Sequence, residues 1–335
     1  MVTVLDVAKM AGVAPITVSR VINRSGYFSE ETRKRVEAAA AELGYVQNSV
    51  ARSLRSSRTN TIALIVSDIT NPFFTSLARG VEDTASDEGY TVFFCNTDEL
   101  TEEEEKYTQV LLQKQVDGFL LVPAHSSPYS IQLIQKHSIP LVVIDRWVPD
   151  VQVDAVRCDS EGGSYQLTRL LLSLGHRNIA VISGPKDVST SIDRVNGFRK
   201  ALEEVGLMFN ETHVQYGEYI QSSGYELTKR ILALDPRPTA IFGTNNFIAI
   251  GILKALNDVG IKVPDDISVV GFDDLPEPLV VSPFLTVAAQ PSYEMGCQAT
   301  RLLLERLAKK GEGEQQQIIL PTDVIVRGST SKVRL

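Results

Sequence analysis

Apolar residues near the N-terminus recur at helical spacing in two short segments on either side of a glycine. The first segment places them at i, i+3, i+4 and i+7, which predicts one apolar face on a short helix. These residues are Val4, Val7, Ala8 and Ala11. The second segment begins near Pro15, which suits a first helical turn, and its apolar residues are Val18, Val21 and Ile22. Gly12 can adopt a positive φ between the two helices, so the pattern predicts a helix-turn-helix unit.

A third helix is predicted after a polar loop. Ser29 precedes two glutamates, and a serine N-cap with acidic residues in the first turn favours a helix start. Its apolar residues are Val36, Ala39, Ala40 and Leu43. Gly44 ends this helix, which closes a small core with the first two. Units of this kind place their second helix in the major groove of DNA.

The outer face of the second helix carries the candidate DNA contacts. If the apolar faces pack inward, the residues left outside are Pro15, Ile16, Thr17, Ser19, Arg20 and Asn23. Arg20 offers a forked guanidinium for a guanine edge, and the small hydroxyls suit phosphates. Ser29 and Tyr45 are further candidate contacts near the backbone of the duplex. A helical hairpin with a solvated face remains the alternative interpretation of these residues.

From Thr61 onward, apolar runs alternate with helical patterns. The strands are predicted at 62–67, 90–95, 118–122, 141–145, 179–183, 239–243 and 267–271. Helices are predicted at 72–88, from the acidic run at 102–105, and at 161–174, 191–206, 222–234 and 245–259. This alternation is typical of a doubly wound α/β fold, here in two halves. Such sheets bind ligands at the carboxyl ends of their strands, and two facing halves form a cleft.

Composition and charge refine this division. The 335 residues suffice for two or three domains, and 43% apolar residues suffice for sizeable cores. The net charge is −8, but residues 1–60 carry nine Lys/Arg and five acids, which leaves +4 there and −12 on the rest. A basic end on an acidic body directs that end toward phosphate. Three widely spaced cysteines and the lack of a signal peptide or membrane span predict a cytoplasmic protein.

Polar and aromatic side chains follow the predicted strand ends. They are Asn71, Phe73, Phe74, Asp145, Arg146, Arg194, Tyr219, Asn245, Phe272, Asp273 and Gln290. Flat aromatic faces with carboxylate, amide and guanidinium groups suit a monosaccharide, since its C–H faces stack on rings and its hydroxyls both donate and accept. Each residue taken alone also has a structural explanation, such as a helix cap, a loop turn or a core position.

The order of residues at the N-terminus resembles a known family. The segments at 4–13 and 17–23 closely resemble the headpiece of the lactose-repressor/galactose-repressor (LacI/GalR) family of bacterial transcription regulators, and the resemblance continues over nearly the whole chain. It implies a helix-turn-helix headpiece at 1–46, a hinge at 47–60 and an effector-binding and dimerisation core at 61–335. Within the core we expect an N-subdomain at about 61–160 and 291–320, and a C-subdomain at about 161–290 and 321–335.

The stretch at 46–60 is basic and rich in serine. Composition alone favours a linker, whereas the family implies a hinge helix that orders on operator DNA and pairs across a dimer in the minor groove. Asn48 can cap that helix, and Ala51 and Leu54 are candidate contacts, with Leu54 as the apolar wedge between base pairs. Gln47 stands where the family usually has proline.

The core also resembles the periplasmic ribose-binding proteins. All the strand-end residues given above fall where that group places its sugar contacts, and Thr190 completes the candidate set. Two positions depart from the related patterns. Tyr219 replaces an apolar aromatic residue of the sugar-binding group, and Asn246 stands where the repressor family normally has aspartate. A ribose-like aldopentose is the expected effector, with a hexose or a nucleoside as alternatives.

The remaining function classes fit the sequence less well. It shows no phosphate-binding glycine fingerprint, no His/Cys metal spacing and no nucleophile elbow, although Asp273 and Asp274 could be read as an acid and a base. We therefore expect no enzyme and no cofactor. The expected protein is a homodimeric repressor of sugar metabolism genes that binds a near-palindromic operator. The alternatives are a regulator of the same fold that is controlled by a protein partner, and a sugar-binding protein or enzyme without a regulatory role.

Overall fold

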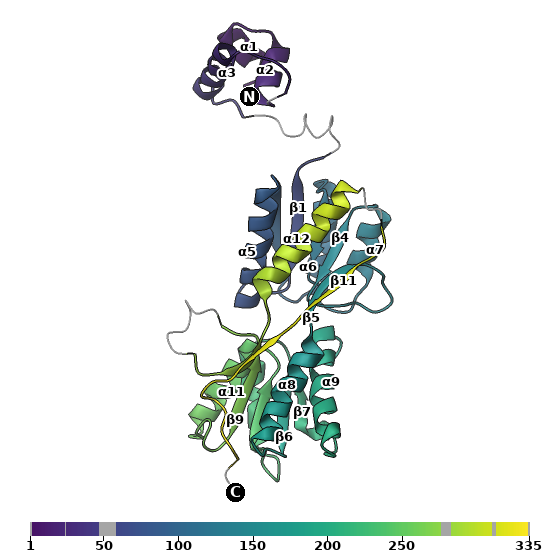
Figure 1. The fold of residues 1–335 in the computed structure, drawn as a ribbon, viewed down its shortest axis with the longest axis vertical. Coiled ribbons are helices and arrows are strands. Elements are labelled where there is room, and N and C mark those ends of the chain that lie inside the picture. Colours follow the sequence, from purple (N-terminus) through teal and green to yellow (C-terminus); the bar gives the residue numbers. More distant parts are fainter. Residues whose placement is uncertain (1, 24, 47–57, 276–282, 310–312, 334–335) are drawn as a thin grey trace. The chain divides into compact units, whose positions relative to one another are not determined.

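The structure consists of two compact units, each with its own core. A computed structural model describes residues 2–23, 25–46, 58–275, 283–309 and 313–333 of the chain, and its contacts divide it into Met1–Thr59 and Asn60–Leu335 (Figure 1). The predicted hinge contacts Asn48, Ala51 and Leu54 lie outside the described residues.

The first unit contains the three predicted helices, α1 (Val4–Ala11), α2 (Pro15–Ile22) and α3 (Glu30–Glu42). Thr3 and Asp6 form a capping box at the start of α1, and Gly12 ends that helix with φ 63°. Val7, Val18 and Val36 are fully buried, one from each helix. The helix-turn-helix pattern is therefore confirmed, with its apolar faces turned inward.

The second unit contains two six-stranded sheets with the same arrangement of strands. The first sheet has the order β11-β5-β4-β3-β1-β2, and all its neighbouring strands are parallel. Its strands are β1 (Thr61–Val66), β2 (Thr91–Asn96), β3 (Gly118–Leu121), β4 (Leu141–Ile144), β5 (Asp154–Cys158) and β11 (Gln317–Leu320). The helices packed on it are α5 (Pro72–Asp87), α6 (Thr101–Gln113), α7 (Tyr129–Lys136) and α12 (Ser292–Ala308). We call this assembly the first half.

The second sheet repeats the pattern in the order β12-β10-β9-β8-β6-β7, with β12 antiparallel to β10. Its strands are β6 (Ile179–Ser183), β7 (Val214–Tyr216), β8 (Ala240–Gly243), β9 (Ser268–Phe272), β10 (Thr286–Ala289) and β12 (Asp323–Ile325). The helices packed on it are α8 (Ser160–Ser173), α9 (Ser189–Glu204), α10 (Gln221–Leu232) and α11 (Asn246–Asp258), and a short 3-10 turn spans Glu211–His213. This is the second half. The predicted doubly wound α/β fold in two halves is confirmed.

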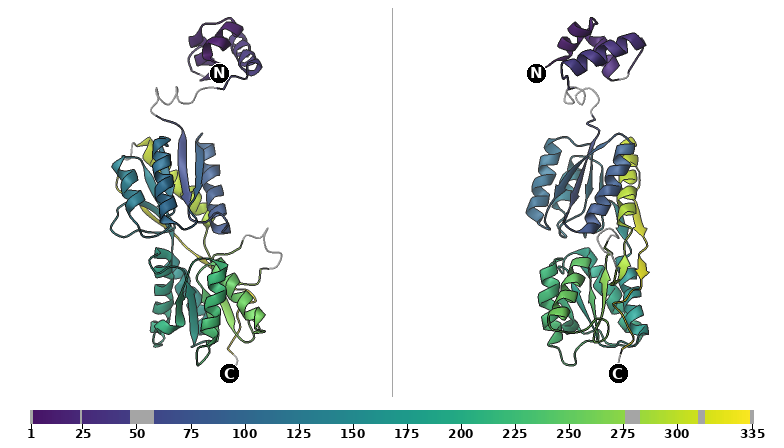
Figure 2. Two further views of the ribbon diagram at one scale, coloured as in Figure 1. Left: turned by 180° about the vertical axis from the view of Figure 1, so that it is seen from behind. Right: turned by 90° about the vertical axis from the view of Figure 1, so that its left-hand side faces the viewer.

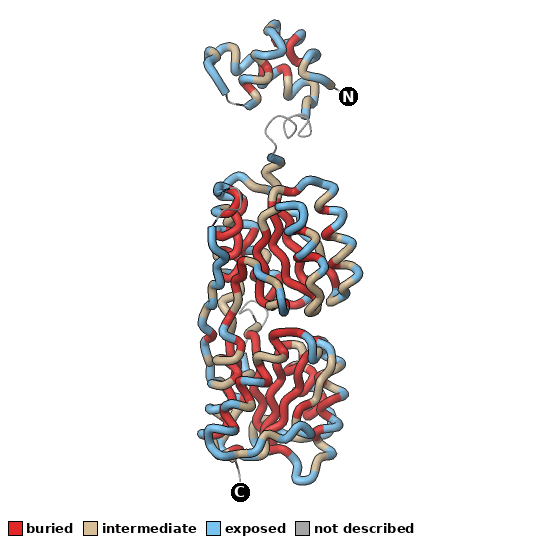
Figure 3. Tube along the Cα trace, turned by 90° about the vertical axis from the view of Figure 1, so that its right-hand side faces the viewer, coloured by how far each residue is buried: buried red, intermediate tan, exposed pale blue. Residues whose placement is uncertain are grey.

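Helices cover both faces of each sheet (Figure 2). Alternate residues of β1 show why: Ile62 and Leu64 pack with α5 and α12, whereas Ala63 and Ile65 pack with α6 and α7. A strand that is buried on both faces has an almost continuous run of apolar residues, and the sequence of β1 shows such a run. The burial colouring shows the result, with buried strands inside and exposed helix surfaces outside (Figure 3).

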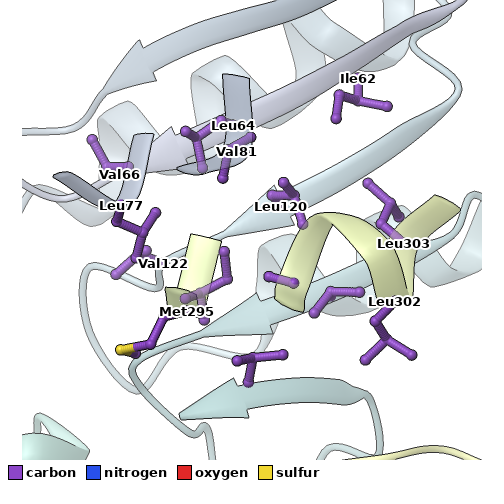
Figure 4. Close-up of a cluster of buried hydrophobic side chains, with 14 of the residues drawn as sticks. Ile62, Leu64, Val66, Leu77, Val81, Leu120, Val122, Met295, Leu302 and Leu303 are labelled. Carbon is purple, nitrogen blue, oxygen red and sulfur yellow. The ribbon is translucent and has the colours of Figure 1, made fainter. Parts of the chain in front are cut away.

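The chain crosses between the halves three times. It leaves the first half after β5, returns after β10 to form α12, and leaves again between β11 and β12. Helix α12 then packs its Met295, Leu302 and Leu303 with Leu77 and β1 in the main core of the first half (Figure 4). A Cβ at Gly80 would lie 2.1 Å from the Tyr293 carbonyl oxygen, so the backbones of α5 and α12 are in direct contact. This contact fixes the position of α5, whose first residues face the second half.

Candidate functional site

The candidate ligand residues lie at the carboxyl ends of the strands, as parallel sheets place them. Asp145 follows β4 and Asp273 follows β9, and these two strands occupy equivalent positions in the two sheets. Both aspartates adopt a left-handed backbone with φ 67°, which a short polar side chain tolerates. Asn71 and Asn245 are the N-caps of α5 and α11, and each caps its helix through its side-chain oxygen.

Ten of the predicted ligand residues line one cleft between the halves. They are Asn71, Phe73, Phe74, Asp145, Thr190, Arg194, Tyr219, Asn245, Asp273 and Gln290. Asp68 and Glu99 also line it. The space left between these side chains is about 20 Å³, which holds about one water molecule. A ligand larger than a water molecule therefore does not fit this cleft unless the two halves move apart.

Two predicted residues, Arg146 and Phe272, lie behind the cleft wall. The Arg146 guanidinium donates from Nη1 to Glu99 at 2.5 Å and from Nη2 to the same carboxylate at 2.7 Å. The fully buried Phe272 ring lies 3.8 Å from the guanidinium carbon of Arg194, so it supports that side chain by a cation–π contact. Both residues hold the groups that face the cleft.

Arg194 is the central cation of the site. It is 3% exposed, donates from Nη1 to the Thr244 carbonyl oxygen at 2.7 Å, and lies 4.0 Å from the Asp273 carboxylate. Burial raises the pKa of Asp145 to about 6, although Arg194 and Arg146 oppose the rise. Burial also raises the pKa of Asp273, against the opposing effects of Arg194 and of a hydrogen bond from Gln290.

Four buried polar atoms of these residues have no hydrogen-bond partner within the part of the chain that the structure describes. The two acceptors are Asp145 Oδ1 and Gln290 Oε1, and the two donors are Arg146 Nε and Arg194 Nε. Leaving such a group unsatisfied costs about 1–3 kcal/mol. Hydroxyl groups can satisfy both kinds, because each donates one hydrogen bond and accepts others.

The hydroxyl of Tyr219 is turned toward helix α9. It lies 3.0 Å from the Thr190 hydroxyl and 2.7 Å from that of Ser191. A Cβ at Gly184 would lie 2.4 Å from the Tyr219 ring, so the glycine makes room for the ring. The hydroxyl that distinguishes Tyr219 from the apolar aromatic residue of the ribose-binding proteins is thus hydrogen-bonded within the second half.

A reciprocal pair of amides joins the halves beside the cleft. Asn71 Nδ2 donates to Asn246 Oδ1 at 3.1 Å, and Asn246 Nδ2 donates to Asn71 Oδ1 at 2.9 Å. Both side chains are buried. Their oxygens also accept backbone N–H groups, from Phe73 and Phe247 respectively. An aspartate at 246 could still accept from Asn71 Nδ2 but would place a second oxygen opposite that of Asn71, so asparagine is what makes the contact reciprocal.

A second set of contacts joins the halves at the start of α9. The Trp147 N–H donates to the Ser189 hydroxyl at 2.9 Å, and its indole N–H donates to Asp193 at 3.2 Å. His125 Nδ1 lies 2.8 Å from the Asp187 carboxylate. Trp147 is the single tryptophan of the chain, so its fluorescence reports on this boundary.

The candidate DNA contacts lie on the surface of the first unit. Pro15, Ile16, Arg20 and Asn23 are exposed, and Thr17 and Ser19 are partly exposed. Asn23 donates to the Ser19 carbonyl oxygen at 2.8 Å. Ser29 caps α3, and Tyr45 is half-buried against the core of the three helices. The structure thus leaves the predicted face of α2 accessible.

Comparison with known proteins follows the same division of the chain. Residues 3–48 match the bacterial regulatory proteins of the lacI family, and residues 59–327 match the periplasmic binding proteins and sugar-binding domain of that family. The chain belongs to the lacI family. A curated relative, the transcriptional repressor PurR of Haemophilus influenzae, is 36% identical over 99% of this chain and 100% of its own length.

Solved structures agree with this assignment. A lac repressor dimer bound to operator and an anti-inducer covers 98% of this chain and 99% of its own, with 26% identity and a TM-score of 0.86. A complex of the transcriptional regulator CelR with cellobiose covers 98% of this chain and 100% of its own, with 34% identity and a TM-score of 0.74. A lacI-family regulator from Enterococcus faecium with bound ribose covers 82% of this chain and 100% of its own, with 31% identity and a TM-score of 0.72.

The chain is therefore a DNA-binding transcriptional repressor of the lacI family, whose members bind operator DNA and small-molecule effectors and act as dimers. Its relatives are regulators and not enzymes. Within the described ranges, no helix combines the length and the apolar character that a membrane crossing needs.

The amide pair generates a testable prediction. Asn246→Asp should open the halves, because the new carboxylate oxygen faces the Asn71 oxygen that Asn246 Nδ2 now contacts at 2.9 Å. Fluorescence of Trp147 should shift to the red and become easier to quench with acrylamide. Asn196→Asp is the matched control, since Asn196 is exposed on α9. Identical emission and quenching in the wild type and Asn246→Asp would show that the pair does not hold the halves together.

Proposed function

We propose that a neutral monosaccharide, best represented by ribose or a similar aldopentose, binds in the cleft and changes the affinity of this repressor for the operator of sugar metabolism genes. The observation that carries the proposal is the set of four buried, unpartnered donors and acceptors around the cleft. Ribose bound to a relative that is 31% identical supports the same ligand class.

The aromatic residues supply the apolar part of such a site. Phe73 and Phe74 meet edge to face, with centroids 5.0 Å apart and planes at 79°, and both line the cleft. Sugar C–H faces pack on such rings, while the hydroxyls satisfy Asp145, Arg194 and Gln290. One small ring with several hydroxyls therefore matches the number and kind of groups available.

Binding must change the relation of the two halves, since the cleft has space for about one water molecule. A sugar that favours one separation of the halves shifts their equilibrium by its difference in affinity for the two states. A coupling of about 1–3 kcal/mol between two sites is usual in allosteric proteins. Residues 47–60 connect β1 of the first half to the three-helix unit. A change in the position of the first half can therefore be transmitted along the chain to the DNA-binding helices.

We further propose that α2 reads the operator in each half-site of a two-fold symmetric dimer. The proposed contacts are Pro15, Ile16, Thr17, Ser19, Arg20 and Asn23, with Ser29 and Tyr45 at phosphates and Asn48, Ala51 and Leu54 in the hinge. Pro15 and Ile16 offer no side-chain hydrogen bonds, so Arg20 is the main candidate for direct recognition of a base.

Arg20→Ala should weaken binding to a duplex that the wild type has selected from a random library. The expected loss is about 1–3 kcal/mol if Arg20 contacts a base edge, with little change on unselected DNA. Fluorescence anisotropy measures both affinities. Lys34→Ala is the control, because Lys34 is an exposed cation on α3. An equal loss on both duplexes would make Arg20 a phosphate contact instead.

Arg194→Ala should abolish ribose binding and spare operator binding. The substitution removes a cleft-lining cation whose Nε has no hydrogen-bond partner among the described residues. It also leaves the buried Asp273 carboxylate without the cation 4.0 Å away from it. Isothermal titration calorimetry measures the first effect and anisotropy the second.

Arg199→Ala is the control on the same helix, where the Arg199 guanidinium stacks on Phe209 away from the cleft. Normal ribose binding by Arg194→Ala would refute the cleft as the effector site. A wild type that binds other sugars but not ribose would refute the aldopentose assignment alone.

A further inference from the structure

Glu99 lines the cleft and engages Arg146 with both carboxylate oxygens. It follows β2 in a left-handed conformation with φ 59°. Its Oε2 accepts from Arg146 Nη1 at 2.5 Å, and its Oε1 accepts from Nη2 at 2.7 Å. The pair is largely buried, with 4% of the Arg146 side chain and 23% of the Glu99 side chain exposed. This bidentate geometry is the strongest form of an arginine–carboxylate contact.

The outer nitrogens of Arg146 are thereby occupied. Nη1 also donates to the carbonyl oxygens of Pro123 at 2.9 Å and Ala124 at 2.7 Å. The Nε of this guanidinium has no hydrogen-bond partner among the described residues, but it lies 3.8 Å from the Asp145 carboxylate, so Arg146 is engaged by two carboxylates of its own half. The forked face of Arg146, which would suit an anionic group, is thus filled by Glu99.

The charges around the cleft also oppose an anion. Two guanidinium groups, Arg146 and Arg194, interact with three carboxylates, Glu99, Asp145 and Asp273, and a fourth carboxylate, Asp68, also lines the cleft. Arg194 is itself 4.0 Å from Asp273. With these groups ionised the set carries a net negative charge, and bringing a phosphate into it would add like charges in a buried space.

We propose that Glu99 determines the class of effector: it restricts the cleft to uncharged sugars and excludes their phosphate esters. The proposal rests on the proposed function and adds the residue that sets its specificity. A purely structural role for Glu99 would alter the affinity for all ligands alike. A selective role alters the ratio between a neutral sugar and its phosphate, and that ratio is the decisive readout.

The test compares the full-length wild type with Glu99→Gln and Glu102→Gln. Glu102 is an exposed carboxylate near the same edge of the cleft, so its variant controls for the loss of one negative charge. Calorimetry with ribose and ribose 5-phosphate gives the affinity ratio, and thermal shifts with inorganic phosphate give a probe that needs no sugar. Thermal melts without ligand establish that each variant is folded.

The wild type and Glu102→Gln should bind ribose at least about tenfold more tightly than ribose 5-phosphate, and phosphate should not stabilise them. In Glu99→Gln the ratio should fall by about tenfold or more, and phosphate should raise the melting temperature. If Glu99→Gln does not fold, the wild-type ratio still decides, since equal binding of both sugars overturns the proposal.

A folded Glu99→Gln with the wild-type ratio and no phosphate stabilisation would also overturn it. The proposed function and the role of Glu99 can be refuted independently of each other. A wild type that binds no neutral sugar refutes the proposed function, while the phosphate arm still decides whether Glu99 excludes anions.

Discussion

The rest of the structure depends on a few charged groups held out of water between two sheets. Asp145 and Asp273 follow equivalent strands, and the Arg194 cation lowers the pKa of both carboxyl groups against the effect of burial. All three are buried, and a buried charge is costly unless other groups pair with it. The strand ends, the left-handed turns and the capped helices of both halves keep these groups in place. Each half pairs its own buried charges, Arg146 with Glu99 and Asp145 in the first half and Arg194 with Asp273 in the second half, and presents them to the cleft.

The contacts around this cleft explain how a small ligand can act on a large protein. The halves are joined by three crossings of the chain, by the Asn71–Asn246 pair and by the contacts of Trp147. Each half has its own dense core, so a change at the cleft moves the halves as bodies and does not deform them. In the first half, direct backbone contact between α5 and α12 transfers the movement of Asn71 to the whole half.

The sequence predicts best where both faces of an element are buried. The continuous apolar runs of β1, β3, β4, β6, β8 and β9 carry a clear signal, and the strand ends then indicate where ligand residues gather. Strands β5, β7, β11 and β12 are not predicted, because β7 and β12 have three residues each and polar side chains interrupt β5 and β11. Strand β10 and the helices α7 and α12 are not predicted either.

The finer roles in the cleft depend on contacts between distant segments. Arg146 follows a predicted strand, but its engagement by Glu99 requires the side-by-side placement of segments 47 residues apart. Glu99 follows the end of a predicted strand, so the same rule that selected Asp145 could have found it. The partnership of Asn71 with Asn246 spans 175 residues, and only the fold brings the two amides together.

The most direct test of these buried charges as the binding determinant is the pH dependence of ribose affinity. Burial holds the pKa of Asp145 at about 6, with Arg194 and Arg146 lowering it and Asp273 and Glu99 raising it. Sugar hydroxyls donate more strongly to the ionised carboxylate, so affinity measured by calorimetry should be full above that pKa and fall as the pH drops from about 7 to about 5. In Asp145→Asn this part of the fall should disappear. A wild-type affinity that stays constant over this range would contradict the account.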